Sequence, residues 1–355
     1  MTARHVIAID ALAARFGGTA YAALQIVSTL LARDDVERVV VVCRPNSLVH
    51  RGLERTRGLT AVTVEPPSLA EVPLRVAWEA VRLPRLLARH QATGLLSMSG
   101  MLPVAPGVPF VGLQANPTPY EGRDGVRKSL RRRAVRRTAT AARATYVPSA
   151  HVATLVGDVA RKRVVALGVD RARFAPIEPP GTELLCVGDF YPHKHHDLLL
   201  DAYGLLAQPR PPLRLVGNPD VDEDNFARIK RKADGIPGVQ VEGRVDFPVL
   251  VEAYQRARAM LIASDRESFS MPVVEALASG VPVIARDYPT LRETAGGGAL
   301  YVRGDDPREW AKAIEQVVAD SRVHAALRRQ GLIHVERYSW DAFAQQLCSD
   351  LGGPS

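Results

Sequence analysis

The sequence has little that would place the protein outside the cell or within a membrane. Its 355 residues include only three cysteines, Cys43, Cys186 and Cys348, which lie far apart and lack the spacing of metal ligands. Such thiols are typical of unpaired cysteines in a reducing compartment. No apolar run approaches the roughly 20 residues of a membrane-spanning helix. The apolar run after the first residues is too short for a signal peptide. We therefore expect a cytoplasmic protein.

The sequence also lacks the motifs of several kinds of chemistry. It contains no G-x-G-x-x-G fingerprint, no metal-ligand spacing and no pattern of a catalytic triad or an activated cysteine. A nicotinamide-dependent enzyme is therefore unsupported. We expect neither a resident metal nor a cofactor.

The composition is that of a folded protein, and its charge is unevenly distributed along the chain. Hydrophobic residues make up 46% of the chain and charged residues 24%, as in soluble globular proteins, and the length suffices for two domains. Residues 1–170 contain 24 basic and 12 acidic side chains, a net charge of +12. Residues 171–355 contain 22 basic and 26 acidic side chains, a net charge of −4. This asymmetry concerns binding partners rather than the fold.

Short β-branched runs alternate with longer segments of helical periodicity. We predict strands at residues 5–10, 38–43, 60–64, 94–97, 108–113, 144–147 and 163–167, and again at 183–188, 213–217, 239–242, 259–263, 281–285 and 299–302. Pro and Gly cluster at residues 168–182, which indicates a linker. Apolar strands joined by helical crossovers are typical of parallel sheets. We predict an α/β fold of two doubly wound domains, with ligands bound beyond the carboxyl ends of the strands.

One segment, SDRESFSMPVVEALASG at residues 264–280, contains most of the candidate site residues. It follows a predicted buried strand and reads as a loop leading into a short helix. Ser270 is a plausible N-cap, Pro272 suits the first turn, and Gly280 suits a left-handed C-terminal cap. The N–H groups at such a helix start attract a diphosphate. Glu267 and Glu275 can accept hydrogen bonds from sugar and ribose hydroxyls, although two acids at this spacing are more often simply solvated.

The whole segment resembles the hallmark of glycosyltransferase family 4, the retaining glycosyl transferases group 1 of the GT-B fold. The likeness rests on Glu267, Phe269, Pro272, Glu275 and residues 276–280. It implies two Rossmann-like domains that face each other across a cleft. We assign residues 1–170 to an N-terminal acceptor-side domain and residues 171–335 to a nucleotide-sugar donor domain. Residues 336–355 resemble the closing helix that crosses back to the first domain.

The resemblance extends to other segments of the donor half. The run VGDFYPHK at residues 187–194 is similar to the family segment V-G-R-x-x-x-x-K, whose Arg and Lys hold the donor diphosphate. Lys194 matches that Lys, whereas Asp189 replaces the Arg, so that another Arg must substitute or the contact is absent. The runs LRLVGN (213–218) and VEGRV (241–245) resemble turns near the nucleotide. The implied donor-binding residues are Gly17, Gly18, Gly188, Lys194, Gly217, Val245, Glu267, Phe269, Ser270, Met271, Pro272, Val273 and Glu275.

The catalytic residues that the resemblance implies are Glu267, Lys194 and Gln114. Gln114 stands where many relatives carry a His near the reacting sugar, and an amide forms hydrogen bonds but cannot titrate. Gly17 and Gly18 resemble a Gly-Gly loop whose backbone approaches the ligand. A tight turn without a ligand is the alternative for these glycines, and a solvated loop lysine is the alternative for Lys194.

The function that the resemblance implies is transfer of a hexose-type sugar from a nucleoside-diphosphate sugar to an acceptor hydroxyl, with retention of configuration and without a metal. The acceptor class is a glycan, a lipid-linked sugar or a small-molecule glycoside. One alternative is another GT-B enzyme, such as a nucleotide-sugar epimerase or a sugar phosphorylase. A second is a non-catalytic nucleotide-sugar-binding protein, to which Asp189 and Gln114 point.

A basic segment at residues 123–143 contains nine basic side chains and one acidic one. We assign Arg127, Arg131, Arg132 and Arg136 to contact with an acceptor or an anionic surface. An anionic membrane or a lipid-diphosphate acceptor suits such a helix, and a solvated helix face is an equally simple interpretation. Nucleic acid is disfavoured, because no base-stacking aromatics or reading motif accompany the charges. A peripheral protein at the inner face of the membrane is one outcome of this assignment.

Overall fold

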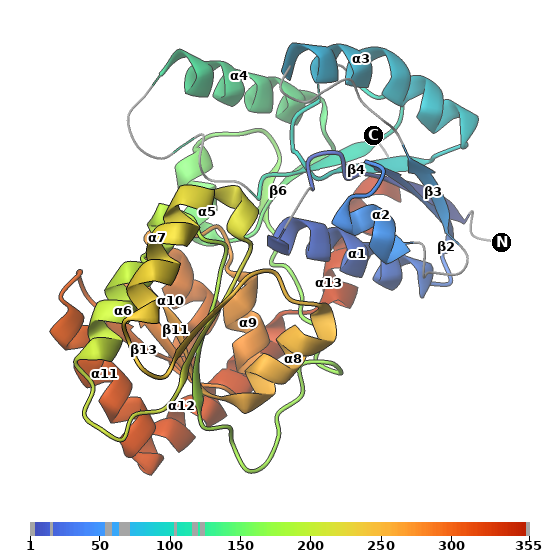
Figure 1. Cartoon of the computed structure of the whole chain (residues 1–355). Helices are drawn as coiled ribbons and strands as arrows, with labels where there is room; N and C mark the ends of the chain where they lie inside the picture. The colour runs from blue at the N-terminus through green and yellow to red at the C-terminus, as the bar shows by residue number, and fades with distance from the viewer. Residues whose placement is uncertain are drawn as a thin grey trace. The chain divides into compact units, whose positions relative to one another are not determined.

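The computed structural model describes residues 4–14, 17–53, 59–63, 72–102, 105–115, 120 and 125–352. Its contacts divide the chain into two units. Unit 1 comprises Met1–Gly168 together with Ser339–Ser355, and unit 2 comprises Val169–Tyr338. Each unit is built around a parallel sheet with helices on both faces (Figure 1). The predicted α/β class is confirmed.

The sheet of unit 1 has the strand order β3-β2-β1-β4-β5-β6-β7. Its strands are β1 (His5–Asp10), β2 (Val36–Cys43), β3 (Thr60–Thr63), β4 (Gly94–Ser97), β5 (Phe110–Leu113), β6 (Ala144–Val147) and β7 (Lys162–Val164). Its helices are α1 (Gly17–Leu31), α2 (Leu48–Leu53), α3 (Val72–Arg89), α4 (Val126–Ala141), α5 (Ala150–Val156) and α13 (Trp340–Gly352).

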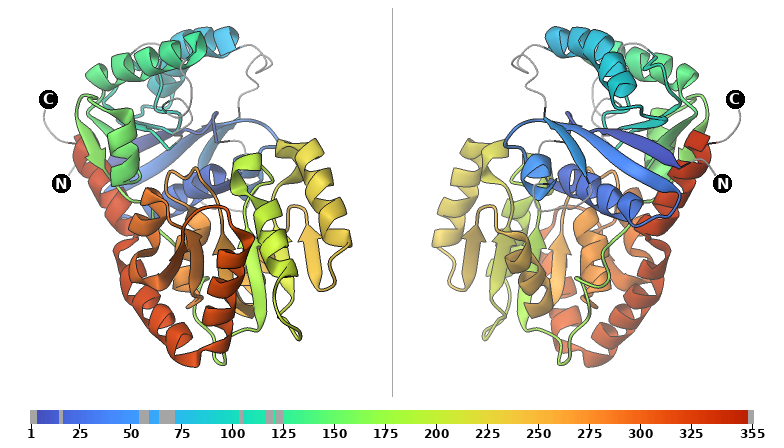
Figure 2. Two further views of the ribbon diagram at one scale, coloured as in Figure 1. Left: turned by 90° about the vertical axis from the view of Figure 1, so that its left-hand side faces the viewer. Right: turned by 90° about the vertical axis from the view of Figure 1, so that its right-hand side faces the viewer.

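Helices cover both faces of this sheet. Figures 1 and 2 show α3 and α4 side by side over one face, and α1 and α13 over the other. Leu83 and Leu87 of α3 belong to a buried cluster with Val40, Val42 and Leu95 of the strands. The last helix, α13, contacts α1, β4 and β5. The chain therefore returns after unit 2 to complete the core of unit 1.

The sheet of unit 2 has the order β10-β9-β8-β11-β12-β13. Its strands are β8 (Glu183–Val187), β9 (Leu213–Val216), β10 (Val239–Glu242), β11 (Ala257–Ile262), β12 (Val283–Arg286) and β13 (Ala299–Val302). Helices α6 (His196–Gly204), α7 (Glu223–Asp234) and α11 (Pro307–Ala319) pack on one face through a cluster that includes Tyr203, Ile229 and Trp310. The remaining elements are η2 (Pro192–Lys194), η3 (Pro219–Val221), α8 (Phe247–Arg256), α9 (Met271–Ala278), α10 (Pro289–Ala295), η4 (Gly296–Gly298), α12 (Ser321–His334) and η5 (Val335–Arg337).

The strand orders explain where ligands bind. In each sheet the order runs outward in one direction and then restarts in the other, between β1 and β4 in unit 1 and between β8 and β11 in unit 2. Neighbouring crossover connections leave a crevice at this switch point, beyond the carboxyl ends of the two strands. In unit 2, the loops that follow β8 and β11 are the places to look for a site.

Some predicted boundaries were wrong. Gly17 and Gly18, expected in a loop, form the first turn of α1. Gly17 has a φ of 59°, which glycine adopts at no steric cost. The strand expected at 163–167 is the shorter β7, and the six-residue α2 was not predicted.

Candidate functional site

An ion pair spans the switch point of unit 2. Lys194 ends η2, which follows β8, and Glu267 lies in the loop that follows β11. The Nζ atom of Lys194 donates a hydrogen bond to Oε1 of Glu267 over 2.5 Å. The two side chains are only 19% and 8% exposed. The structure therefore brings together two of the three predicted catalytic residues, from distant parts of the sequence.

The turn after β8 positions Lys194. An ideal Cβ at Gly188 would lie 3.6 Å from Cδ of Lys194, so the aliphatic stem of the lysine passes over this glycine. The Lys194 N–H donates to the Tyr191 carbonyl over 3.0 Å. The Asp265 N–H donates to the His193 carbonyl over 3.1 Å and joins this turn to the loop that contains Glu267.

Two threonines of α10 hold the loop that contains Glu267. The hydroxyl of Thr290 donates to the Glu267 carbonyl over 2.9 Å, and that of Thr294 donates to the Phe269 carbonyl over 2.7 Å. Both bonds are buried. Backbone held by buried hydrogen bonds is costly to displace, so the backbone of Glu267 is held in place.

The surroundings tune the charges of this site. Burial lowers the pKa of Lys194, but the charge and hydrogen bond of Glu267, helped by Asp189, raise it above its ordinary value overall. Burial, together with the charge of Lys194, lowers the pKa of His193 to about 4. At neutral pH the lysine is therefore charged and the adjacent histidine is neutral.

The N-terminus of α9 differs from the prediction in one respect. Ser270 has a φ of 68° and makes no side-chain cap, because a capping side chain needs extended backbone to reach the helix N–H groups. Its Oγ is buried with no hydrogen-bond partner among the described residues. Pro272 lies in the first turn and Gly280 has a φ of 69°, as predicted. The Val273 N–H donates to the Ser270 carbonyl over 3.0 Å, so it is already bonded.

The side chains of Phe269, Met271 and Val273 are buried in unit 2. Contacts of these three predicted donor-binding residues with a ligand would therefore come from their backbone. Val245, another apolar residue in that prediction, lies between β10 and α8 and is half-buried.

Glu275 is a buried carboxyl group inside α9. The hydroxyl of Tyr254, on α8, donates to its Oε2 over 2.8 Å. Burial raises the pKa of Glu275 to about 7, and the hydrogen bond from Tyr254 opposes that rise. Sequence reasoning missed Tyr254, because no spacing links it to Glu275 and only the packing of α8 on α9 reveals the pair.

Asp189 lies at the carboxyl end of β8 and turns toward β9. Its Oδ1 accepts a hydrogen bond from the Asn218 N–H over 3.2 Å. Gly217 precedes Asn218, and Gly188 precedes Asp189. A Cβ added at Gly217 would come within 2.0 Å of the Gly188 carbonyl oxygen. Gly188 and Gly217 thus shape a close contact of two strand ends. Asp189 occupies the position of the cation that the resemblance leads one to expect.

The remaining predicted site residues, Gln114, Gly17 and Gly18, belong to unit 1. Gln114 follows β5, is buried, and donates from Nε2 to the Gly100 carbonyl over 2.6 Å. Gly17 and Gly18 are exposed at the start of α1, where helix N–H groups have no intrahelical partner. The hydrogen bond of Gln114 fits a structural role at least as well as a catalytic one.

The basic segment forms α4, which contains seven basic and no acidic residues. Arg131 and Arg136 are exposed and Arg132 is half-buried, whereas the side chain of Arg127 lies outside the described residues. Val126 is 78% exposed and Leu130 is 61% exposed. One helix therefore presents both cationic and apolar side chains to solvent.

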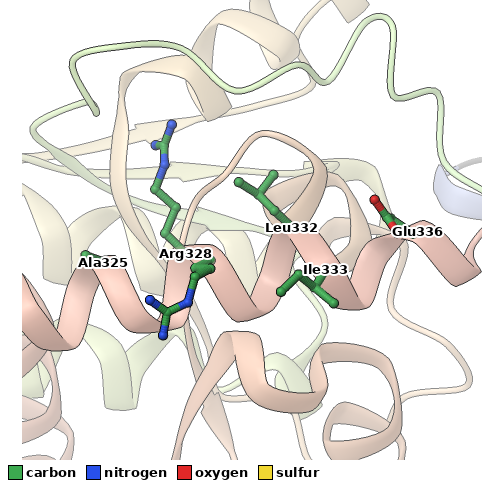
Figure 3. Close-up of a pocket in the computed structure, with 6 residues that line it drawn as sticks. Ala325, Arg328, Leu332, Ile333 and Glu336 are labelled. Atoms are coloured by element: carbon green, nitrogen blue, oxygen red, sulfur yellow. The ribbon is translucent and has the colours of Figure 1, made fainter.

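Other sites are less informative. Figure 3 shows a surface pocket on α12 and η5 that contains none of the predicted site residues and is lined by Ala325, Arg328, Arg329, Leu332, Ile333 and Glu336.

Among the described residues, no group of three or more His, Cys, Asp or Glu side chains has the arrangement of a metal site. No described helix is both long enough and apolar enough to span a membrane. The three cysteines are buried without disulfides.

Sequence comparison finds relatives of the part of the chain that contains Lys194, Glu267 and Glu275. Residues 181–320 match the family model of the glycosyl transferases group 1. The chain is 33% identical to the D-inositol 3-phosphate glycosyltransferase of Thermobispora bispora over 178 residues, which are 46% of this chain and 41% of the relative. The chain spans about half the length of the curated relatives it matches.

Solved structures extend the likeness to the fold of nearly the whole chain. Sucrose-phosphate synthase from Thermosynechococcus elongatus aligns with a TM-score of 0.77 at 20% identity and covers 97% of both chains. HepE from Anabaena, solved in complex with UDP-glucose, aligns with a TM-score of 0.78 at 15% identity and covers 98% of this chain and 99% of its own. The chain thus has the GT-B fold, and residues 181–320 of unit 2 match the family model of the glycosyl transferases group 1.

Proposed function

We propose that the protein is a glycosyltransferase that moves a hexose-type sugar from a nucleoside-diphosphate sugar to an acceptor hydroxyl, with retention of anomeric configuration. The observation that carries the proposal is the Lys194–Glu267 pair at the switch point of unit 2, beside the start of α9. The family match over residues 181–320 and the UDP-glucose complex of the similar HepE support it.

The donor is held by unit 2 in this proposal. Lys194 turns from Glu267 to the diphosphate, and its flexible ammonium suits a phosphate without a fixed approach direction. The start of α9 adds the positive end of its dipole. Glu275 accepts hydrogen bonds from the ribose, and Glu267, once released by the lysine, accepts them from the transferred sugar.

The chemistry requires stabilisation of a leaving group. The bond between the anomeric carbon and the diphosphate oxygen breaks, and its electron pair leaves with the diphosphate. A new bond forms to the acceptor oxygen, whose proton passes to the departing diphosphate. Positive charge fixed before reaction, as on Lys194, stabilises this departure most effectively where water is scarce. Gln114 cannot take up the proton, which is why we assign it no acid–base role.

The acceptor is bound by unit 1, and α4 docks that unit on an anionic lipid surface. Seven basic side chains without an acid attract such a surface, at about 1 kcal/mol for each Lys or Arg close to it. Val126 and Leu130 add exposed apolar contacts on the same helix. A lipid-linked acceptor at the inner face of the membrane fits this arrangement best.

Donor screening tests the proposal. Thermal unfolding is recorded with UDP, GDP, ADP and dTDP sugars, and the best donor is then incubated with candidate acceptors while products are analysed. A bound donor at ten times its dissociation constant stabilises the protein by about 1.4 kcal/mol. Product formation only with an acceptor supports transfer, whereas an altered donor without an acceptor indicates an epimerase.

Variants connect that activity to the site. Glu275→Ala should weaken donor binding about tenfold, the loss of roughly one hydrogen bond, and Lys194→Gln should weaken it at least as much. The exposed Glu252→Ala on α8 is the matched control. Full donor binding by Lys194→Gln, with folding verified, would contradict the proposed site.

A further inference from the structure

The charge of Lys194 is already paired with a carboxylate. Lys194 is matched by Glu267, and Asp189 adds a second carboxylate to the same edge of the sheet. At the start of α9, Pro272 lacks an N–H, and the Val273 N–H is bonded to Ser270. A diphosphate carries negative charge on each phosphate. If the proposed function holds, a second cation must face the ligand.

Arg244 lies at the same carboxyl edge. It follows β10, as Asp189 follows β8, and β9 lies between these two strands in the sheet. The residue after β9 is Gly217, which has no side chain to separate the two loops. Arg244 is exposed, and its guanidinium lies 3.6 Å from the Asp220 carboxylate. It is thus a charged, solvent-accessible side chain beside the predicted nucleotide turn at Val245.

The charges of Arg244 and Lys194 both act on the carboxylate of Asp189. Its carboxylate is fixed at one oxygen by the Asn218 N–H. Burial raises the pKa of Asp189, whereas that N–H and the charges of Lys194 and Arg244 act to lower it. The Asp189 carboxylate therefore interacts electrostatically with Lys194, after β8, and with Arg244, after β10.

We propose that Arg244 is the second cationic ligand of the donor diphosphate, with Asp220 holding its guanidinium at the edge of the sheet. A guanidinium presents two parallel N–H donors to phosphate oxygens. Its pairing with Asp220 is long and exposed, and exposed ion pairs contribute little stability, so a phosphate displaces it readily. The substitution of Asp189 for a cation is then compensated by a residue two strands away.

Paired nucleotides test this assignment. Calorimetry measures binding of UDP and UMP, GDP and GMP, and ADP and AMP to the wild-type protein, and the tightest-binding base is taken forward. The variants are Arg244→Gln and, as a matched control, Arg231→Gln on the exposed surface of α7. We expect Arg244→Gln to weaken diphosphate binding at least tenfold and monophosphate binding less than threefold. Arg231→Gln should change neither.

Lys194→Gln separates the inference from the function on which it rests. Loss of diphosphate binding in Lys194→Gln, together with wild-type binding in Arg244→Gln, overturns the role of Arg244 and leaves the proposed function standing. A wild-type protein that binds none of the diphosphates overturns both. Thermal unfolding verifies that each variant is folded. If Arg244→Gln does not fold, Arg244→Lys replaces it, and a loss of diphosphate binding below twofold in that variant counts against the bidentate contact.

Discussion

Lys194 and Glu267 form a hydrogen-bonded ion pair of 2.5 Å at the point where the strand order of unit 2 reverses. The carboxylate of Glu267 thus accepts a hydrogen bond from the lysine that the proposed function assigns to a diphosphate. Donor binding must exchange one anionic partner of Lys194 for another. Variants of Lys194 and of Glu267 should therefore affect donor binding differently.

Replacing Glu267 by Gln should separate binding from turnover. The variant removes the anion that competes for Lys194, so affinity for the nucleoside diphosphate stays unchanged or rises. Turnover should fall by about 100-fold, since the sugar loses a positioning partner. Calorimetry and steady-state kinetics measure the two effects, with the exposed Glu252→Gln as control. Near-normal turnover in folded Glu267→Gln would remove Glu267 from the site.

The buried carboxyl group of Glu275 should make stability depend on pH. Its pKa is about 7 in the folded protein, against 4.5 for an ordinary Glu. Between these values the unfolded state loses the proton while the folded state keeps it, so stability falls as pH rises through this window and then levels off. The full effect is about 3 kcal/mol at most.

Chemical denaturation at about pH 5 and about pH 8 measures this component. Glu275→Gln cannot ionise, so the wild type should lose more stability over the interval than this variant. Equal pH dependence of the two proteins would mean that Glu275 titrates in its ordinary range and that its site is hydrated.

Gly217→Ala tests the close contact of two strand ends. The new Cβ would lie 2.0 Å from the Gly188 carbonyl oxygen, and backbone cannot give way as a flexible side chain does. We expect a loss of about 1–3 kcal/mol in unfolding free energy and weakened nucleotide binding, because Gly188 underlies Lys194. Gly243→Ala is the control, since its Cβ would lie at an ordinary 3.7 Å from Pro219. Equal stability of the two variants would refute the contact.

The basic helix α4 should serve the acceptor side and not the donor. Reversing Arg131, Arg132 and Arg136 to Glu should reduce binding to anionic vesicles by about 100-fold, at roughly 1 kcal/mol for each lost attraction. Nucleotide affinity should stay unchanged, because charges on an exposed helix are screened within about 8 Å at physiological salt. Vesicle co-sedimentation across a salt series and calorimetry measure the two. Unchanged vesicle binding would make α4 an ordinary solvated face.

We also expect turnover without a divalent metal. Lys194, the start of α9 and Arg244 supply the positive potential that a metal would otherwise provide. Activity measured in chelator, with and without later addition of Mg²⁺ or Mn²⁺, checks this. Loss in chelator and recovery with either ion would show that the cationic side chains do not suffice.

Much of the fold could be predicted from the sequence because it depends on local patterns. Strands β1, β4 and β6 lie at their predicted residues, since each is a short apolar run between polar turns. The bounds of α9 were equally predictable, from Pro272 in its first turn and Gly280 after its last. Parallel sheets alone also predict that loops after different strands meet, as Lys194 and Glu267 do.

The details of the site required three-dimensional contacts. The hydrogen bond from Tyr254 to Glu275 joins two helices with no shared spacing. The left-handed backbone of Ser270 overrides its ordinary capping preference. Asp189 departs from the expected cation, and only its hydrogen bond to the Asn218 N–H shows how the protein uses a carboxylate there.

Helix α13 has a consequence for the order in which the protein acquires its structure during synthesis. Unit 2 is continuous, so it can fold as soon as the ribosome has released its residues. Unit 1 must wait for α13, whose Leu351 packs on Gly94 and whose Asp350 accepts a hydrogen bond from Tyr146 over 2.6 Å. Domains generally fold as units during synthesis, and here the first half of the chain is the last to be completed. Until then, the sheet surface that α13 will cover is exposed to chaperones and proteases.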